Sequence, residues 1–188
     1  MTVSVFFFCW AWIHNPESRF LYATYSTDFA LRDSMRCRDL IASKWYQTNW
    51  NNRFAIRVDA DTKAFFANNC SGFRSCSSPR AATTGQRADF LVCDDILKIE
   101  EGDSDVAREE VNQWFDQVMA TRGSDPRTAR FIVVQQRLHP CDLAGHLLEG
   151  GDFEHFFVPM EFESHRRCTT SIGWQDPRTK DGELAWPD

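Results

Sequence analysis

The stretch Thr84–Lys98, TGQRADFLVCDDILK, decides the fold that we predict for this chain of 188 residues. It contains a short apolar run, Phe90–Cys93, that ends at two adjacent carboxylates, Asp94 and Asp95. A continuous apolar run is typical of a buried parallel strand, and ligands of open α/β sheets bind beyond the carboxyl ends of such strands. The stretch therefore predicts a strand that delivers two acids to a site at a sheet edge. The alternative is a strand followed by a solvated acidic turn.

A second apolar run, Phe131–Val134, lies further along the chain and ends in Gln135, Gln136 and Arg137. Between the two runs, a stripe at helical spacing predicts an amphipathic helix with the apolar residues Val111, Trp114, Phe115, Val118 and Met119. Strands that alternate with helices indicate an α/β domain with a mostly parallel sheet flanked by helices.

The remaining pattern predicts elements on either side of these runs. They are a strand over 19–25, a helix with its apolar face at Ala30, Ser34, Cys37, Ile41 and Trp45, a half-buried strand at Phe54, Ile56 and Val58, a hairpin turn over 68–72, an exposed loop over 75–85 and a last strand over 153–160. That last strand is one candidate to cover the free side of the Phe131 strand; otherwise that side stays open.

Composition bounds the class of protein. With 43% hydrophobic residues, the chain can form a globular domain with a core, and its net charge of −6 provides no general basic surface for nucleic acid. Seven cysteines without a C-x-x-C pair are unlike a secreted disulfide framework, so we expect a reducing cytosol. The apolar run over 3–13 lacks a basic flank and is too short for a membrane span, so it predicts a buried helix.

Several blocks of the sequence, in order, resemble the large terminase subunit of tailed bacteriophages, the ATPase that drives DNA into the capsid. The blocks are FLYATYSTDFALRDSMRCRDLI, Gly72–Arg74, TGQRADFLVCDD, SDVAREEVNQWFDQVMATR, FIVVQQRLHPCDLAGHLL and WQDPRTKDGELAWP, which together cover most of residues 1–188. The resemblance implies a RecA-like P-loop ATPase core in which Asp94 ends the Walker B strand. It also implies that the Phe131–Gln135 strand pairs in parallel with the Phe90–Cys93 strand, which would place Asp94 and Gln135 at the same sheet edge.

The same resemblance implies that the core is incomplete at the N-terminus. No Gly in the chain is followed by Lys, whereas the family's P-loop lies just before a segment that looks like Thr2–Ile13. The family also continues into a nuclease domain after a GELAWP-like segment. We therefore expect a partial ATPase core over 1–163 and a linker toward an absent nuclease domain over 164–188.

The function implied for the intact protein is Mg²⁺-dependent ATP hydrolysis coupled to DNA translocation, with ATP and Mg²⁺ as cofactors. The implied partners are double-stranded viral DNA, the portal protein and the small terminase subunit, in a homo-oligomeric ring that has no membrane contact. The implied location is the host cytoplasm, at the procapsid portal. Because a Walker A motif is missing, we expect this chain to be inactive alone.

The resemblance also assigns roles to the polar strand ends. Asp94 would hold Mg²⁺ through water, because Mg²⁺ keeps several waters and takes one or two carboxylates. Asp95 would polarise the attacking water; the alternative is a capping or solvated acid. Gln135 and Gln136 take the place of the coupling motif that senses the γ-phosphate, and the sequence leaves open which of the two does so.

Two arginines are candidate phosphate ligands. Arg87 would reach a phosphate, either in its own chain or across a subunit boundary, and Arg137 would support an anionic site. The alternatives are ion pairs, of Arg87 with Asp89 and of Arg137 with Asp142.

Three residues are candidate DNA contacts because they follow the second strand of the family. Tyr25, Ser26 and Thr27 offer hydroxyls and a helix N-terminus, which are common partners of backbone phosphates. The alternative is that Ser26 or Thr27 only caps the following helix.

Two other classes of function stay open. One is a non-enzymatic interaction module that docks on a terminase or portal, and the other is a carboxylate-metal nuclease that uses Asp94 and Asp95. The set His139, Cys141 and His146 lacks the spacing of a zinc site, so we expect ordinary surface and core roles for it.

Overall fold

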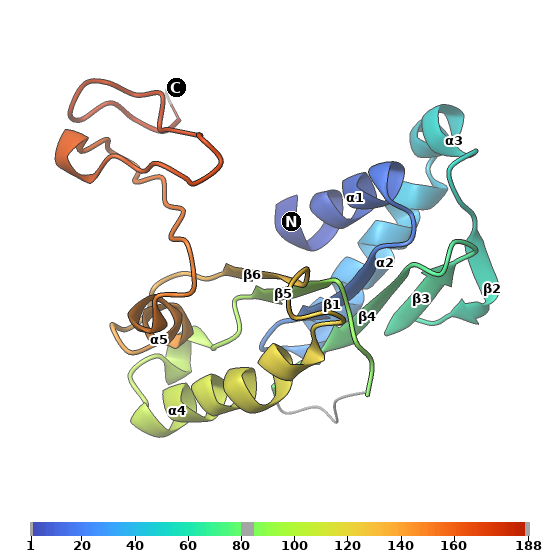
Figure 1. The fold of residues 1–188 in the computed structure, drawn as a ribbon, viewed down its shortest axis with the longest axis horizontal. Helices are drawn as coiled ribbons and strands as arrows, with labels where there is room; N and C mark the ends of the chain where they lie inside the picture. The colour runs from blue at the N-terminus through green and yellow to red at the C-terminus, as the bar shows by residue number, and fades with distance from the viewer. Residues whose placement is uncertain (1, 80–84, 187–188) are drawn as a thin grey trace. The chain divides into compact units, whose positions relative to one another are not determined.

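The computed structural model describes residues 2–79 and 85–186, which contain a six-stranded mixed sheet with the strand order β2-β3-β4-β1-β5-β6 (Figure 1). The strands are β1 (Arg19–Ala23), β2 (Ile56–Asp61), β3 (Phe65–Asn68), β4 (Phe73–Ser77), β5 (Phe90–Asp94) and β6 (Arg130–Val134). The pairs β4–β1, β1–β5 and β5–β6 are parallel, whereas the pairs β2–β3 and β3–β4 are antiparallel. The predicted α/β class is confirmed.

Helices cover both faces of this sheet. The helical elements that precede residue 151 are η1 (Thr2–Phe7), α1 (Phe8–His14), α2 (Thr27–Ala42), α3 (Lys44–Trp50), η2 (Ile99–Glu101), α4 (Asp105–Trp114), η3 (Phe115–Met119), η4 (Ala120–Arg122) and α5 (Leu143–Gly150). In Figure 1, α1 and α2 lie on one side of the sheet and α4 on the other. Within the described residues, no helix combines the length and apolar character that a membrane span requires.

Alternation along the strands explains these two layers. Phe20 of β1 meets Phe8 of α1 with ring centroids 4.9 Å apart, while Phe131 of β6 faces Phe115 at 6.1 Å. Successive strand residues point to opposite faces, so Tyr22 shares the α1 and α2 face with Phe20. On that face aromatic side chains dominate the core, and Trp12 is fully buried among them.

Three sequence predictions are wrong in detail. Val58 is 96% exposed because β2 is an edge strand, so its alternation does not mark a buried face. Trp45 is 61% exposed because α2 ends at Ala42 and Ser43 starts a new helix by accepting a hydrogen bond from the Tyr46 backbone N–H. The described segment 153–160 forms no strand.

Other predicted elements are confirmed. The hairpin at 68–72 joins β3 to β4, and the apolar run 3–13 is helical as η1 and α1. The expected loop over 75–85 begins later than predicted because β4 extends to Ser77. Thr84, which belongs to the family-like TGQRAD block, lies outside the described residues.

The chain divides into two compact units, Met1–Ala144 and Gly145–Asp188. The second unit has its own interior: Arg178 pairs with buried Asp176 at 2.7 Å and lies over the ring of Phe162 at 5.4 Å. It also contains η5 (Ser164–Arg166). Arg178 donates to the backbone carbonyls of Met160 and Glu183. The segment for which the sequence predicts a linker thus contains a buried ion pair that ties its backbone together.

At the amino ends of the central strands, Asp89 holds β1 beside β5. Its carboxylate accepts hydrogen bonds from the Arg19 backbone N–H at 3.0 Å, the Arg19 guanidinium at 2.8 and 3.1 Å, and the Ser124 hydroxyl. Burial alone would raise the pKa of Asp89, but the hydrogen bonds from Arg19 and Ser124 hold it below its ordinary value. This carboxylate therefore stabilises the fold most when it is ionised.

We expect Asp89→Asn to lower the free energy of unfolding by about 1–3 kcal/mol at pH 7, since charged hydrogen bonds are lost. A carboxyl whose pKa is depressed on folding contributes above its unfolded pKa, about 3.9, and loses the contribution as the pH falls through its folded pKa. The difference between Asp89→Asn and wild type should therefore shrink toward zero as the pH falls below 4 in urea titrations. Asp59→Asn is the control, because Asp59 pairs with Arg57 at the surface, where an ion pair contributes little, and it should change stability much less than Asp89→Asn does at pH 7. An Asp89→Asn effect independent of pH would contradict the assignment.

Candidate functional site

The carboxyl ends of three parallel strands meet at one edge of the sheet. Asp94 at the end of β5 lies in register with Val134 at the end of β6, so Gln135 and Gln136 follow at the same edge. Ala23, the last residue of β1, lies beside Cys93, which brings Thr24 and Tyr25 to this edge too. The predicted parallel pairing and the shared edge of Asp94 and Gln135 are confirmed.

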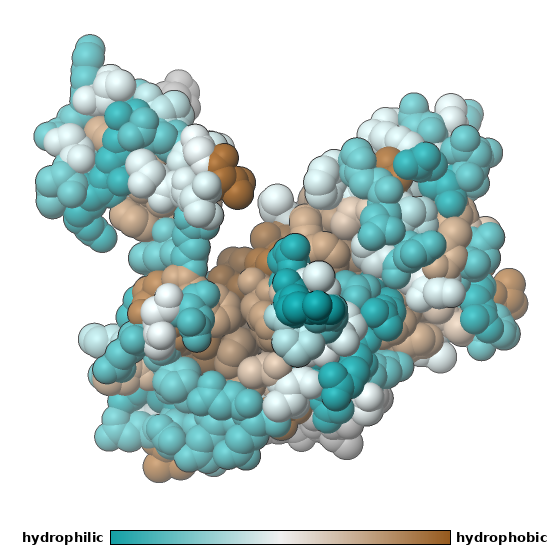
Figure 2. Space-filling view, in the orientation of Figure 1, coloured by the Kyte–Doolittle hydropathy of each residue, from teal (hydrophilic) through white to brown (hydrophobic). Residues whose placement is uncertain are grey.

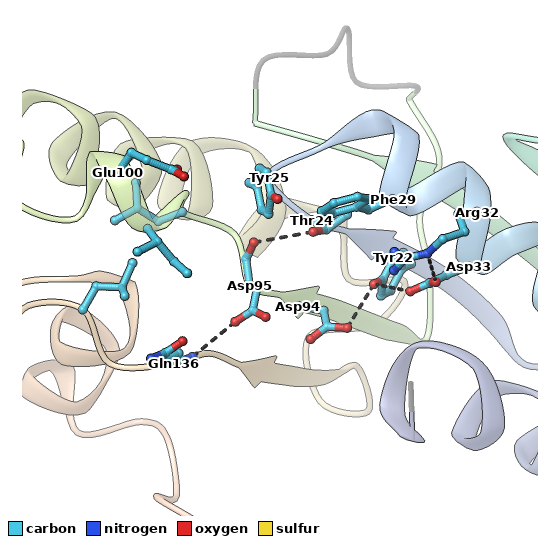
Figure 3. Close-up of a pocket in the computed structure, with 13 residues that line it drawn as sticks. Tyr22, Thr24, Tyr25, Phe29, Arg32, Asp33, Asp94, Asp95, Glu100 and Gln136 are labelled. Carbon is cyan, nitrogen blue, oxygen red and sulfur yellow. Dashed lines mark hydrogen bonds and ion pairs between the residues drawn. The ribbon is translucent and has the colours of Figure 1, made fainter.

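A pocket of about 340 Å³ opens at this edge (Figure 3). It is lined by Tyr22, Thr24, Tyr25, Phe29, Arg32, Asp33, Asp94, Asp95, Leu97, Ile99, Glu100, Gln136 and Leu138. Four of these side chains are acids and one is an arginine, so the pocket has an excess of negative charge. Such a lining attracts cations and repels an anion that arrives without one.

Asp94 lies half-buried in the pocket, where its Oδ2 accepts a hydrogen bond of 3.0 Å from the Tyr22 hydroxyl. Burial raises the pKa of Asp94 above its ordinary value, the Tyr22 hydrogen bond opposes this, and the charges of Asp95 and Asp33 add to the rise. Burial likewise raises the pKa of Tyr22, with smaller contributions from the charges of the two carboxylates that it contacts, so the phenol keeps its proton. A cation beside Asp94 would relieve this crowding of negative charge.

Asp95 ties the three strand ends together. Its backbone N–H donates to the Val134 carbonyl at 2.9 Å, and its own carbonyl accepts from the Tyr25 N–H at 3.2 Å. Its Oδ1 accepts from the Gln136 N–H at 3.2 Å, as Figure 3 shows. The residue has a left-handed backbone with φ of 44°, a conformation that Asp and Asn tolerate better than most residues.

We expect Asp95→Ala to lower the free energy of unfolding by about 1–2 kcal/mol, because Ala loses the hydrogen bond to Gln136 and is poorly suited to a left-handed backbone. Asp95→Asn should stay close to wild type, since Asn keeps an acceptor oxygen and tolerates this backbone. Chemical denaturation of the two variants measures the difference. Equal stability of Asp95→Ala and wild type would show that the hydrogen bond between the Asp95 carboxylate and the Gln136 N–H does not stabilise the fold.

The two glutamines differ in position. Gln136 lines the pocket, whereas strand alternation turns Gln135 to the opposite face, where its amide nitrogen and oxygen are buried. Neither amide atom of Gln135 has a hydrogen-bond partner among the described residues. Of the two candidates for a phosphate sensor, Gln136 is thus the one placed beside Asp94 and Asp95.

The two candidate arginines are both engaged, at different places. Arg137 forms an ion pair of 3.1 Å with buried Asp142, which confirms that alternative. Arg87 precedes β5, at the end of the sheet remote from Asp94, and donates to the Gly123 carbonyl at 3.1 Å. The alternative pairing of Arg87 with Asp89 is wrong, because Asp89 binds Arg19 instead. Neither arginine lines the pocket.

The candidate DNA-contact residues lie where β1 passes into α2. Ser26 occupies the N-cap position of α2, but its side chain makes no capping hydrogen bond, so the capping alternative is wrong for this hydroxyl. The Thr27 hydroxyl lies 3.3 Å from that of Ser78, and the Tyr25 ring packs edge-on against Phe29. Tyr25 is the member of the three that lines the pocket.

Sequence reasoning missed Tyr22 and Asp33, which complete the pocket behind Asp94. Tyr22 belongs to an apolar strand run and resembles an ordinary core residue. Asp33 is buried on α2 although it is charged, and a signal was present, because it lies three residues after Ala30 and four before Cys37, on the helix's apolar stripe.

The donor set suits Mg²⁺ in one respect. Mg²⁺ takes one or two carboxylates and completes its shell with water and phosphate oxygens, and Asp94 and Asp95 supply such carboxylates at a strand end. Among the residues that the structure describes, no group of three or more His, Cys, Asp or Glu side chains is arranged to hold a metal ion. Any cation here would therefore complete its shell with water or with oxygens of a bound ligand.

Comparison with protein-family models finds no matching family, and comparison with curated proteins finds no match. The pocket at the carboxyl ends of β1, β5 and β6 is therefore the basis for a proposed function.

Proposed function

We propose that the chain is part of a RecA-like ATPase core from a phage terminase large subunit, and that the Asp94 pocket is the side of its nucleotide site that carries the Walker B acid. The observation that carries this proposal is the parallel β1-β5-β6 order, which brings Asp94 and Gln136 to one sheet edge. In the intact protein, ATP with Mg²⁺ would supply the phosphoryl group and the cation, and the reaction would be coupled to translocation of double-stranded DNA.

In this proposal each pocket residue has a distinct task. Asp94 would hold Mg²⁺ through a water, and the Tyr22 hydroxyl donates to the Asp94 carboxylate while no cation is bound there. Asp95 would polarise water with Oδ2, because its Oδ1 accepts from the Gln136 N–H. Gln136 would be the residue placed to sense a phosphate, and its N–H links the end of β6 to Asp95.

The position of β6 at the edge of the sheet supports the proposal that another strand lies beside it in the intact protein. Within the described residues, β6 pairs only with β5, and its other side carries no strand. Figure 2 shows apolar surface in the region of α1 and β6, where Phe6, Trp10 and Val134 are exposed. A further parallel strand, such as the one that leads into a P-loop, would satisfy the backbone groups of β6 and cover part of this surface. The portal protein, the small terminase subunit and a homo-oligomeric ring follow as proposed partners of the intact protein.

The excess of acids favours one other candidate function, a metal-dependent nuclease. Asp33 and Glu100 join Asp94 and Asp95 in the pocket, which is more carboxylates than the sequence indicated. Cleavage of plasmid DNA by the purified chain in Mg²⁺ or Mn²⁺, lost in Asp94→Asn, would favour this candidate over the ATPase.

The proposed function predicts that the purified chain is catalytically silent. Phosphate binding in this class rests on a P-loop that the sequence lacks, so phosphate release from ATP should not exceed that of Asp94→Ala. Turnover that depends on Asp94 would contradict the proposal. Reading the DNA directly upstream of Met1 is the companion experiment, and an in-frame Gly-Lys-Ser or Gly-Lys-Thr segment there would support the proposal.

A further inference from the structure

The Tyr22 hydroxyl lies within hydrogen-bond distance of two carboxylates from different elements. Its oxygen is 3.0 Å from Oδ2 of Asp94 on β5 and 3.3 Å from Oδ2 of Asp33 on α2, and Figure 3 draws both contacts. A phenol has one proton, so it donates to one of the two carboxylates at a time. The two contacts therefore compete for the same proton.

Neighbouring side chains hold the Asp33 carboxylate and the Tyr22 ring in place, whereas the phenolic proton is free to turn. Oδ1 of Asp33 accepts from Arg32 at 3.0 Å and from Arg36 at 3.5 Å, whereas the Tyr22 hydroxyl lies 3.3 Å from Oδ2. Burial alone would raise the pKa of Asp33, but Arg32 and the Ser4 hydroxyl stabilise the ionised carboxylate and lower that pKa. The Tyr22 ring is buried, and the guanidinium of Arg74 lies over it at 4.6 Å. Rotation of the hydroxyl between Asp94 and Asp33 thus requires no movement of the ring.

We propose that Tyr22 is a positioning residue that transmits the charge of Asp94 to α2: its hydroxyl donates to Asp94 when that carboxylate is bare, and turns to Asp33 when the charge on Asp94 is neutralised. Hydrogen bonds to an ionised acceptor are roughly twice as strong as those to a neutral one, so the proton follows the remaining charge. The inference rests on the proposed function in one respect, namely that a divalent cation is the natural neutralising agent.

The consequence is a connection between the pocket and the helix that begins at the candidate DNA contacts. α2 starts at Thr27, and Asp33 lies in its second turn. When the hydroxyl turns to Asp33, that carboxylate gains a donor in addition to Arg32 and Arg36. A change at Asp94 would thereby alter the hydrogen bonding of α2 without any displacement of the sheet.

The test uses the full chain with ¹³C-labelled aspartate carboxyls, observed by NMR at one fixed pH of 7.5. Asp94→Asn removes the charge of Asp94, and the Asp33 carboxyl resonance should shift in response. The same substitution in a Tyr22→Phe background should move the Asp33 resonance much less, because the phenol is gone while the ring beneath Arg74 is kept and only the direct field of Asp94 remains. Tyr25→Phe is the matched control, because its ring lines the same pocket but its hydroxyl contacts neither Asp33 nor Asp94; in that background the shift should persist.

Two results would overturn the inference. A shift of Asp33 that keeps its full size in Tyr22→Phe would show that the field of Asp94 acts through space alone, and no shift in the wild-type background would show that the two acids are unconnected. If Tyr22→Phe does not fold by circular dichroism, the reciprocal measurement decides instead: Asp33→Asn should move the Asp94 carboxyl resonance, and a stationary Asp94 resonance would refute the inference.

Addition of Mg²⁺ separates this inference from the proposed function. If the inference and the proposed function both hold, Mg²⁺ moves the Asp33 resonance of the wild type in the same direction as Asp94→Asn does. If Asp94→Asn moves Asp33 and Mg²⁺ does not, the cation step of the proposed function fails while the Tyr22 connection stands.

Discussion

Asp94→Asn is expected to lower kcat for ATP hydrolysis by about 100-fold or more in the intact ATPase domain of which we propose this chain to be a part. A metal ion supplies several kcal/mol of transition-state stabilisation, and each 1.36 kcal/mol corresponds to about a factor of ten in rate. Asn keeps the size of the side chain but removes the charge that would orient the cation. Steady-state phosphate release in Mg²⁺ measures the effect.

The matched control is Asp39→Asn, because Asp39 is exposed on α2 and does not line the pocket. It should leave kcat within about twofold of the unsubstituted chain, which is small beside the tenfold that 1.36 kcal/mol represents. Equal rates in Asp94→Asn and Asp39→Asn would remove Asp94 from the reaction and leave the pocket without its proposed role.

Trp12→Ala is expected to lower the free energy of unfolding by about 3–5 kcal/mol. Trp12 is fully buried (0% exposed), its ring meets those of Phe8 and Phe54 at 4.6 and 5.0 Å, and its indole N–H donates to the Ser18 carbonyl at 2.8 Å. A loss of this size is a large part of the stability of an ordinary domain. Urea denaturation followed by circular dichroism measures it.

Trp10 on the same helix provides the comparison. Its side chain is 56% exposed, so Trp10→Ala should change stability by about 0.5 kcal/mol or less. If the β6 edge and α1 are covered by another segment in the intact protein, Trp10→Ala should become more destabilising there than in this chain. Equal losses for Trp12→Ala and Trp10→Ala would contradict the packing described for α1.

The apolar strand runs were predictable because burial on both faces leaves a distinct pattern. Phe90–Cys93 and Phe131–Val134 both form strands, and their parallel pairing follows from the helix between them. The segment 153–160 has a comparable content of apolar residues but forms no strand. A strand requires a partner edge as well as a suitable sequence, and composition does not reveal whether an edge is available.

The acids that end the strand were predictable, whereas the residues behind them were not. Asp94 and Asp95 stand out because a charged pair follows an apolar run. Tyr22 and Asp33 come from other elements and meet Asp94 only after β1 pairs with β5 and α2 packs on the sheet. Long-range convergence of this kind depends on strand order, which a single sequence constrains weakly.

The most direct measurement of the central claim is the position of a bound divalent cation, read from the broadening of backbone NMR signals by Mn²⁺ in the full chain. The two strands provide their own control, because Asp94 and Gln136 lie at one end of the β5–β6 pair and Phe90 and Arg130 at the other. The account predicts that Asp94, Asp95 and Gln136 broaden first, that Phe90 and Arg130 stay sharp, and that Asp94→Asn abolishes the effect. Broadening centred elsewhere in the chain, with the signal of Asp94 unchanged, would contradict the account.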